Sequence, residues 1–263
     1  MNISKPDQPA WQHYKTVMGG TVDIMDVAIV SNGDTLRLFA VCATGIYQSS
    51  SDNPKWINTS DGIQNIDLQA IAASPNFQQD QTLFVGGGQS GLFQSTDAGQ
   101  NWQPLTGWPI QDTITAIALS PAYAQDSTLL ITTLQEGVYL STDAGVNWKS
   151  VNFGIPNTFL LDVKISPNYL VDKTAFIVAD DGLYWTKNGA KAWREVRGFP
   201  SDTPQSLAFS PCFSQDQTMF LATEDMGVLR SYNGGKKWQK GNDVGAKAII
   251  NTVVVSPYFE KDD

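Results

Sequence analysis

Short apolar runs separated by polar turns follow one another along the whole chain, without the 3.6-residue periodicity of an amphipathic helix. In one unit, an apolar stretch ends at Ser74, and a β-prone run follows at 83–85. Gly91 then precedes an aliphatic and an aromatic residue, and a polar turn ends at Trp102. A unit of this kind predicts four short β-strands separated by turns.

The unit repeats with a period of about 45 residues. Six tryptophans are spaced by 45 or 46 residues: Trp11, Trp56, Trp102, Trp148, Trp193 and Trp238. Ser-Pro pairs recur at 44 or 46 residues, beginning at Ser74, Ser120, Ser166, Ser210 and Ser256. A glycine lies eleven residues before each of the last five tryptophans: Gly45, Gly91, Gly137, Gly182 and Gly227. Three markers that keep one period indicate a repeat architecture.

Four strands in each repeat are typical of a β-propeller, in which the blades surround an axis. The stretch before Ser-Pro alternates bulky Ile117 and Leu119 with small Ala116 and Ala118, which suits an inner strand near a narrow axis. We therefore predict one all-β domain over 1–263, with an all-β solenoid as the structural alternative. Five complete blades are expected at about 18–60, 61–107, 108–153, 154–198 and 199–243.

The ends of the chain predict a split, incomplete sixth blade. Trp11 lies one period before Trp56, so 1–17 matches an outer strand, and 249–259 within 244–263 matches an inner strand. The two middle strands, about 20 residues by the repeat length, have no counterpart. Either the chain is part of a longer product, or something else fills the gap. Because natural proteins avoid open strand edges, self-association through the incomplete blade is one expectation.

The turn before the tryptophan reads S-x-D-x-G-x-x-W in two repeats, at 95–102 and 141–148. An Asp carboxylate accepts backbone N–H bonds in such a turn, Gly allows a positive φ, and Trp buries a large ring. The copies at 49–56 and 186–193 have diverged further than the copy at 231–238, where Asn replaces Asp. The motif residues are Ser95, Asp97, Gly99, Trp102, Ser141, Asp143, Gly145, Trp148, Ser231, Asn233, Gly235 and Trp238.

With this motif the chain resembles the Asp-box, or BNR-repeat, β-propellers. That family includes sialidases, xyloglucanases, sortilin-type receptors, the photosystem II assembly and stability factor, and many uncharacterised bacterial repeat proteins. The Ser-Pro element beside the Asp-box looks most like the last group. The resemblance implies a propeller fold and says little about function.

Composition excludes several classes of function. The 17 basic and 26 acidic residues give a net charge of −9, which is unfavourable for nucleic-acid binding. No apolar run is long enough to span a membrane, and the first ten residues lack the apolar stretch of a secretory signal, so a cytoplasmic protein is expected. With one histidine and two cysteines, we expect no metal site, no cofactor and no disulfide framework.

The sequence offers little for catalysis, and we assign no catalytic residue. The arginine triad of sialidases would have to come from only four arginines, and none begins an inner strand. A hydrolase needs two facing carboxylates, and nothing pairs Asp26 with Asp162. The Asp residues that recur with the repeat are explained by the turns they form.

Positions that differ between repeats are more informative. Inter-blade segments carry aromatic residues beside proline, and the loops between the second and third strands are acidic in three successive repeats. We expect them to form an acidic, aromatic-containing mouth around the channel, unless the loops are merely solvated and the aromatics pack on neighbouring blades. The candidate residues are Asp26, Gln69, Trp108, Asp112, Glu136, Asp162, Asp180, Asp181, Gln205, Glu224, Asp225 and Asn251.

These observations favour a non-enzymatic interaction or assembly module that presents this face to a protein or a small ligand. A carbohydrate-active protein, either a glycoside hydrolase or a glycan binder, is the alternative. Trp185 replaces a Gln, Leu or Arg of other repeats, and it is either an exposed contact or a packed ring. The sequence does not identify the partner.

Overall fold

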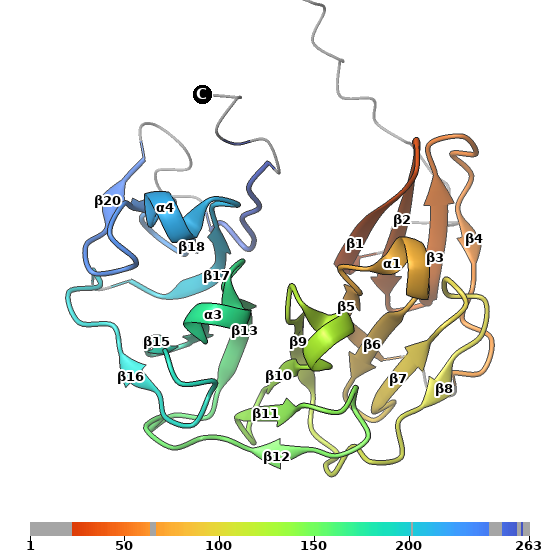
Figure 1. The fold of residues 1–263 in the computed structure, drawn as a ribbon, viewed down its shortest axis with the longest axis horizontal. Helices are drawn as coiled ribbons and strands as arrows, with labels where there is room; N and C mark the ends of the chain where they lie inside the picture. Colours follow the sequence, from red (N-terminus) through yellow and green to blue (C-terminus); the bar gives the residue numbers. More distant parts are fainter. Residues whose placement is uncertain (1–22, 64–66, 201, 242–248, 257–258, 260–263) are drawn as a thin grey trace, which may run out of the picture.

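The computed structural model describes residues 23–63, 67–200, 202–241, 249–256 and 259. They form an all-β propeller of five four-stranded antiparallel blades, which follow one another around a central opening (Figure 1). Blade 1 contains β1 (Ile24–Asn32), β2 (Thr35–Cys42), β3 (Gly45–Ser50) and β4 (Ile57–Asn58). Blade 2 contains β5 (Leu68–Ala73), β6 (Leu83–Gly87), β7 (Leu92–Ser95) and β8 (Gln103–Pro104). Blade 3 contains β9 (Ile114–Leu119), β10 (Leu129–Thr133), β11 (Val138–Ser141) and β12 (Lys149–Ser150).

The last two blades repeat the same plan. Blade 4 contains β13 (Leu160–Ile165), β14 (Ala175–Ala179), β15 (Gly182–Thr186) and β16 (Arg194–Glu195). Blade 5 contains β17 (Pro204–Phe209), β18 (Met219–Thr223), β19 (Val228–Ser231) and β20 (Gln239–Lys240). The prediction of five four-stranded blades is therefore confirmed, and each observed blade lies within one of the five predicted repeats.

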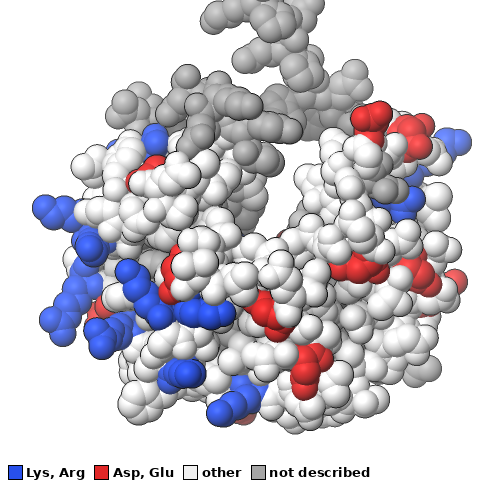
Figure 2. Space-filling model, viewed as in Figure 1, with Lys and Arg blue, Asp and Glu red and all other residues white. Residues whose placement is uncertain are grey.

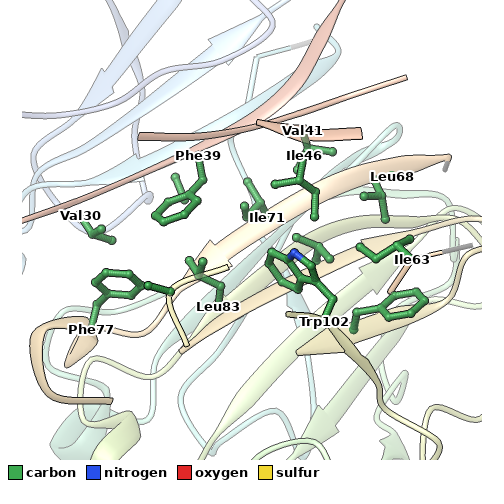
Figure 3. Close-up of a cluster of buried hydrophobic side chains, with 14 residues drawn as sticks. Val30, Phe39, Val41, Ile46, Ile63, Leu68, Ile71, Phe77, Leu83 and Trp102 are labelled. Atoms are coloured by element: carbon green, nitrogen blue, oxygen red, sulfur yellow. The ribbon is translucent and has the colours of Figure 1, made fainter. Parts of the chain in front are cut away.

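The core consists of apolar layers between successive blades. Phe39 of blade 1 is fully buried against blade 2, where Leu83 and Trp102 meet it (Figure 3). The Trp102 indole also donates a 2.8 Å hydrogen bond to the Thr59 carbonyl of blade 1. The Trp193 indole donates in the same way to the Val151 carbonyl of blade 3, at 2.8 Å. Burying each such side chain contributes about 1.5–3 kcal/mol, so these two tryptophans stabilise the contact between successive blades.

The Ser-Pro element forms a short helical turn between the first two strands of blades 2 to 5. These turns are α1 (Phe77–Asp80), α2 (Tyr123–Asp126), α3 (Tyr169–Asp172) and α4 (Phe213–Asp216). In blade 2, the Ser74 hydroxyl donates to the Asp80 carboxylate at 2.6 Å, and the Thr82 amide donates to the same carboxylate at 2.9 Å. The same bonds recur in the other three copies, which explains why the spacing is constant.

The S-x-D-x-G-x-x-W turn has the expected geometry. The Asp143 carboxylate accepts the Ser141 hydroxyl at 2.8 Å and the Asn147 amide at 2.9 Å. Asn233 accepts the corresponding amide of Lys237 at 2.9 Å, so the Asn of the diverged copy still forms the turn. These turns lie at the same end of each blade as α1 to α4, which we call the helix end (Figure 1).

The described residues do not form the predicted sixth blade. Its proposed outer strand, 1–17, lies outside the described residues, as does part of 244–263. Residues 249–256 are described and form no strand, although the Ile250 amide donates to the Thr223 carbonyl of β18 at 3.1 Å. Among the described residues, no strand lies between blades 5 and 1 (Figure 1), and Ile29 of β1 is 62% exposed there.

Candidate functional site

The opposite end of the propeller, which we call the loop end, carries the start of each inner strand and the turn between the second and third strands. One polar residue precedes each inner strand of blades 2 to 5 with a spacing of 45 residues: Asp67, Asp112, Asn157 and Asp202. Each side chain forms hydrogen bonds with the turn between the second and third strands of its own blade, an arrangement that we call a bracket. The sequence interpretation included only Asp112 among the site residues, although the regular spacing is visible in the sequence.

In blades 3 and 5, each bracket consists of hydrogen bonds that turn amides donate to a carboxylate. The Asp112 carboxylate accepts the amides of Gln135 and Glu136, each at 2.8 Å. The Asp202 carboxylate accepts the amides of Asp225 at 3.2 Å and Met226 at 2.9 Å. Each turn is therefore tied to the inner strand of its own blade, which limits its freedom to move.

In blade 4 the bracket is reversed. The Asn157 side-chain amide donates to the Asp180 carboxylate at 2.5 Å, and the Tyr184 hydroxyl donates to Asp181 at 3.0 Å. Glu136, Asp180, Asp181 and Asp225 are exposed, while Glu224 is half-buried and accepts the side-chain amide of Gln205 at 3.2 Å. Three consecutive blades thus hold carboxylates at the loop end.

The same hydrogen bonds stabilise the ionised form of the Asp112 and Asp202 carboxylates. Burial acts to raise the pKa of Asp112, but the amides of Gln135 and Glu136 outweigh it, and the pKa falls below its ordinary value of 3.8. The pKa of Asp202 is lowered in the same way, since hydrogen bonds to Thr223 and Met226 outweigh burial. Both groups are ionised at neutral pH and add to the negative charge of the loop end.

The structure gives Asp26 and Asp162 a different role from the one expected. Asp26 follows a β-bulge and pairs with Val41, as Asp162 pairs with Val178 after its own bulge, so the two residues occupy equivalent positions. Asp26 accepts the Ile71 amide of the next inner strand at 2.8 Å, and Asp162 accepts the Leu207 amide at 3.2 Å. Both carboxylates therefore connect neighbouring blades.

The pKa of Asp26 also responds to charges on β13. Strands β1 and β13 lie on opposite sides of the central opening (Figure 1). Burial raises the pKa of Asp26, although the Ile71 and Val27 amides oppose this; Lys164 lowers it and Asp162 raises it. Lys164 forms a 2.7 Å ion pair with Asp162. Since both acids hold backbone amides and one is ion-paired, the geometry supports a structural role rather than acid–base catalysis.

Trp108 does not lie on the exposed face. Its ring packs edge-on against Tyr139 at 5.4 Å and against Trp148 at 5.0 Å, because the next blade covers the segment that carries it. The aromatic residue that the sequence interpretation missed is Phe159, which is 39% exposed directly before β13, where its carbonyl accepts the Asp180 amide.

The remaining predicted residues are spread out. Gln69 is half-buried at the bulge of β5, and Asn251 is exposed in the segment after blade 5. Among the described residues, no group of three or more His, Cys, Asp or Glu side chains could hold a metal ion. Within the same residues, no helix is long and apolar enough to cross a membrane. The predicted site residues that lie together are therefore the acidic residues at the loop end of blades 3, 4 and 5.

Comparison with known proteins supports the fold. No family model and no curated protein matches the sequence. An ancestral GH74 enzyme matches 89% of this chain with a TM-score of 0.72 at 18% identity, and the match covers 33% of that enzyme. The GH74 xyloglucanase of Xanthomonas campestris matches 89% of this chain with a TM-score of 0.66 at 17% identity, over 42% of its own length.

A smaller protein is also similar. YCF48, in a structure titled as bound to D1 peptide, matches 85% of this chain and 68% of its own, with a TM-score of 0.59 at 16% identity. The chain spans about a third to two fifths of the GH74 proteins it resembles. At these identities the similarities establish a β-propeller and leave the function open.

Proposed function

We propose that this protein is a non-enzymatic interaction module of the Asp-box propeller type, and that its loop end binds a protein partner with a basic surface. The observation that carries the proposal is the bracketed series of acidic turns in blades 3, 4 and 5. Carboxylates on turns whose backbone is held in place, with the exposed ring of Phe159 beside the Asp180 turn, suit lysine- and arginine-containing segments. The peptide-bound neighbour YCF48 shows that a propeller of this shape can take a peptide.

A carbohydrate-active protein is the second candidate, because two of the similar structures are GH74 enzymes. Hydrolysis would need two carboxylates free to act on a sugar. Asp26 and Asp162 are occupied by amides of the next blade, which weighs against this reading. Incubation with xyloglucan and measurement of new reducing ends tests it, and turnover that is lost in Asp162→Asn but not in Asp34→Asn would favour the hydrolase.

The interaction proposal is tested with a labelled lysine-rich peptide that contains one aromatic residue, and with its glutamine counterpart. The triple variant Glu136→Gln, Asp181→Asn and Glu224→Gln keeps the side-chain shapes and removes three charges. We expect saturable, salt-sensitive binding of the lysine peptide that weakens at least about tenfold in the triple variant. The control is Asp34→Asn, which removes an exposed charge from the turn between β1 and β2. Equal binding of both peptides would contradict the proposal.

The sixth blade remains a proposal of its own. Residues 249–259 carry the inner-strand pattern, and Val27 and Ile29 of β1 are exposed beside the opening. An apolar strand of this kind favours pairing with added strands, including those of a second copy. Light scattering at high protein concentration tests self-association, and a strict monomer would count against it.

A further inference from the structure

A second candidate surface lies between blades 4 and 5, away from the loop end. A cleft of about 870 Å³ is bounded by α3 and α4, by strand β16 and by the turn at 233–236. Buried Phe176, Val196 and Phe213 contribute its apolar wall. We call this feature the blade 4–5 cleft, and its lining includes Trp185, the cations Lys187, Arg194, Arg197 and Lys236, and the acids Asp172 and Glu195.

The cleft is positively charged. Its four cations, Lys187, Arg194, Arg197 and Lys236, are exposed. Within the part of the chain that the structure describes, the ion pair of Lys164 with Asp162 involves none of them, and no other ion pair is present. Figure 2 shows lysine and arginine side chains gathered over this side of the molecule. The cleft therefore offers four cations that form no ion pair among the described residues.

Two acids also line the cleft, Asp172 and Glu195, so the four cations leave it a positive excess of two charges. The Asp172 carboxylate is held by the Ser166 hydroxyl and the Thr174 amide, each at 2.7 Å. Glu195 pairs across the strand with Tyr184, whereas Arg194 pairs with Trp185. Because side chains alternate between the faces of a strand, Glu195 lies on the opposite face from Arg194 and Trp185.

Trp185 gives the cleft an aromatic surface beside its cations. It is half-buried, and the Lys187 ammonium lies 5.3 Å from its ring centre. Arg194 is its cross-strand neighbour. An apolar side chain of a ligand can therefore pack on the ring while its acidic neighbours meet the lysine and the two arginines.

The cations are not required by the repeat. Between blades 2 and 3, the residues at the matching positions are uncharged: Gln94, Thr96, Gln103, Thr106 and Val146. The charge also divides along the chain, since 18–153 contains three basic and twelve acidic residues, whereas 154–243 contains ten of each. A basic cleft on an otherwise acidic molecule attracts an acidic ligand to one place and repels it elsewhere.

We propose that the blade 4–5 cleft binds an acidic peptide segment that carries an apolar anchor residue. The volume lies in the range of sites that enclose a sizeable ligand, so a single inorganic anion would fill little of it. A nucleic acid would extend its phosphates over the acidic surface of blades 1 to 3. The proposal is independent of the loop-end function, because it concerns another face and the opposite charge.

The test uses a fluorescently labelled glutamate-rich peptide with one central Phe, and the same peptide with Gln in place of Glu. Anisotropy titrations compare the wild type with Arg194→Gln/Lys236→Gln, which changes only exposed side chains. The matched control is Lys149→Gln, at the position of blade 3 that corresponds to Arg194. We expect the double variant to bind the acidic peptide at least about tenfold more weakly, and the control to bind it unchanged. Unchanged melting temperatures verify that the variants fold.

Further measurements separate the alternatives. Trp185→Ala is expected to weaken the Phe-containing peptide more than a peptide with Ala at the centre, which supports an apolar anchor. Equal affinity for the Glu and Gln peptides, or full affinity in the double variant, would overturn the proposal. Complete displacement of the Glu peptide by inorganic phosphate, added at a concentration that supplies the same total negative charge, would also overturn it. The cleft would then be a simple anion site. The triple loop-end variant should bind this peptide as the wild type does, which separates the two proposals.

Discussion

Asp162 provides the sharpest test of how the blades are held together. Its carboxylate joins inner strand β13 to inner strand β17 by accepting the Leu207 amide at 3.2 Å and the Ser206 hydroxyl at 3.1 Å. The residue is only 6% exposed, so Asp162→Ala leaves the Leu207 amide without this partner in a buried position. The equivalent position in blade 3 is Ala116, so alanine fits the strand and the substitution isolates the connection.

The expected loss follows from the bonds. An unsatisfied buried amide costs about 1–3 kcal/mol, and a hydrogen bond to a charged group contributes about 1.5–3 kcal/mol. The ion pair with Lys164 adds little, about 0–1 kcal/mol, because the lysine is 39% exposed. Since the first two figures describe the same contacts in part, we expect the free energy of unfolding to fall by about 3 kcal/mol.

Urea denaturation followed by tryptophan fluorescence and circular dichroism measures this loss. Asp34→Ala, an exposed acid in the turn between β1 and β2, is the control and should change stability by less than about 0.5 kcal/mol. Asp162→Asn keeps one acceptor oxygen and should lose less than alanine does. A loss in Asp162→Ala no larger than that of the control would refute the inter-blade role of the carboxylate.

Two further predictions concern the turns. Bonds from the Asn147 amide and other groups lower the pKa of Asp143 below 3.8, so its contribution to stability is present above that pH and lost as the pH falls through the lowered value. Asp143→Asn should therefore make the melting temperature depend less steeply on pH below about 3.8. A dependence as steep as that of the wild type in this range would contradict the prediction. Gly154 has φ +93°, and a Cβ there would overlap the Trp193 carbonyl. Gly154→Ala should lower the unfolding free energy by about 1–3 kcal/mol in urea titrations. An unchanged free energy would contradict this, because it would mean that the backbone around Gly154 moves to accommodate the Cβ.

Much of the fold was predictable because the repeat fixes it locally. The recurring Ser, Asp, Thr and Trp residues each make contacts within a turn or to the adjacent blade, so spacing alone reveals them. The β-bulge beside Asp26 recurs in all five blades, but blade 1 has no Ser-Pro pair to set the register of its inner strand, so the equivalence of Asp26 and Asp162 is not apparent from the sequence. Sequence spacing does not contain that information.

The candidate sites were less predictable because their geometry depends on how segments distant in the sequence pack together. Trp108 is covered by Tyr139 and Trp148, which lie 31 and 40 residues later in the same predicted repeat. The blade 4–5 cleft combines Arg194 of one blade with Lys236 of the next. Neither arrangement follows from the pattern of a single repeat, whereas the bracketing series at Asp67, Asp112, Asn157 and Asp202 could have been found from its constant spacing.

Hydrogen–deuterium exchange with the lysine-rich peptide tests the central proposal most directly, because it locates the bound face. We predict slower exchange at the loop-end turns 134–137, 180–181 and 224–227 when the peptide is bound. Exchange at the helix end, in α1 to α4, should be unchanged. Protection confined to the helix end, or no protection at the three acidic turns at saturating peptide, would contradict the proposal that the loop end is the binding face.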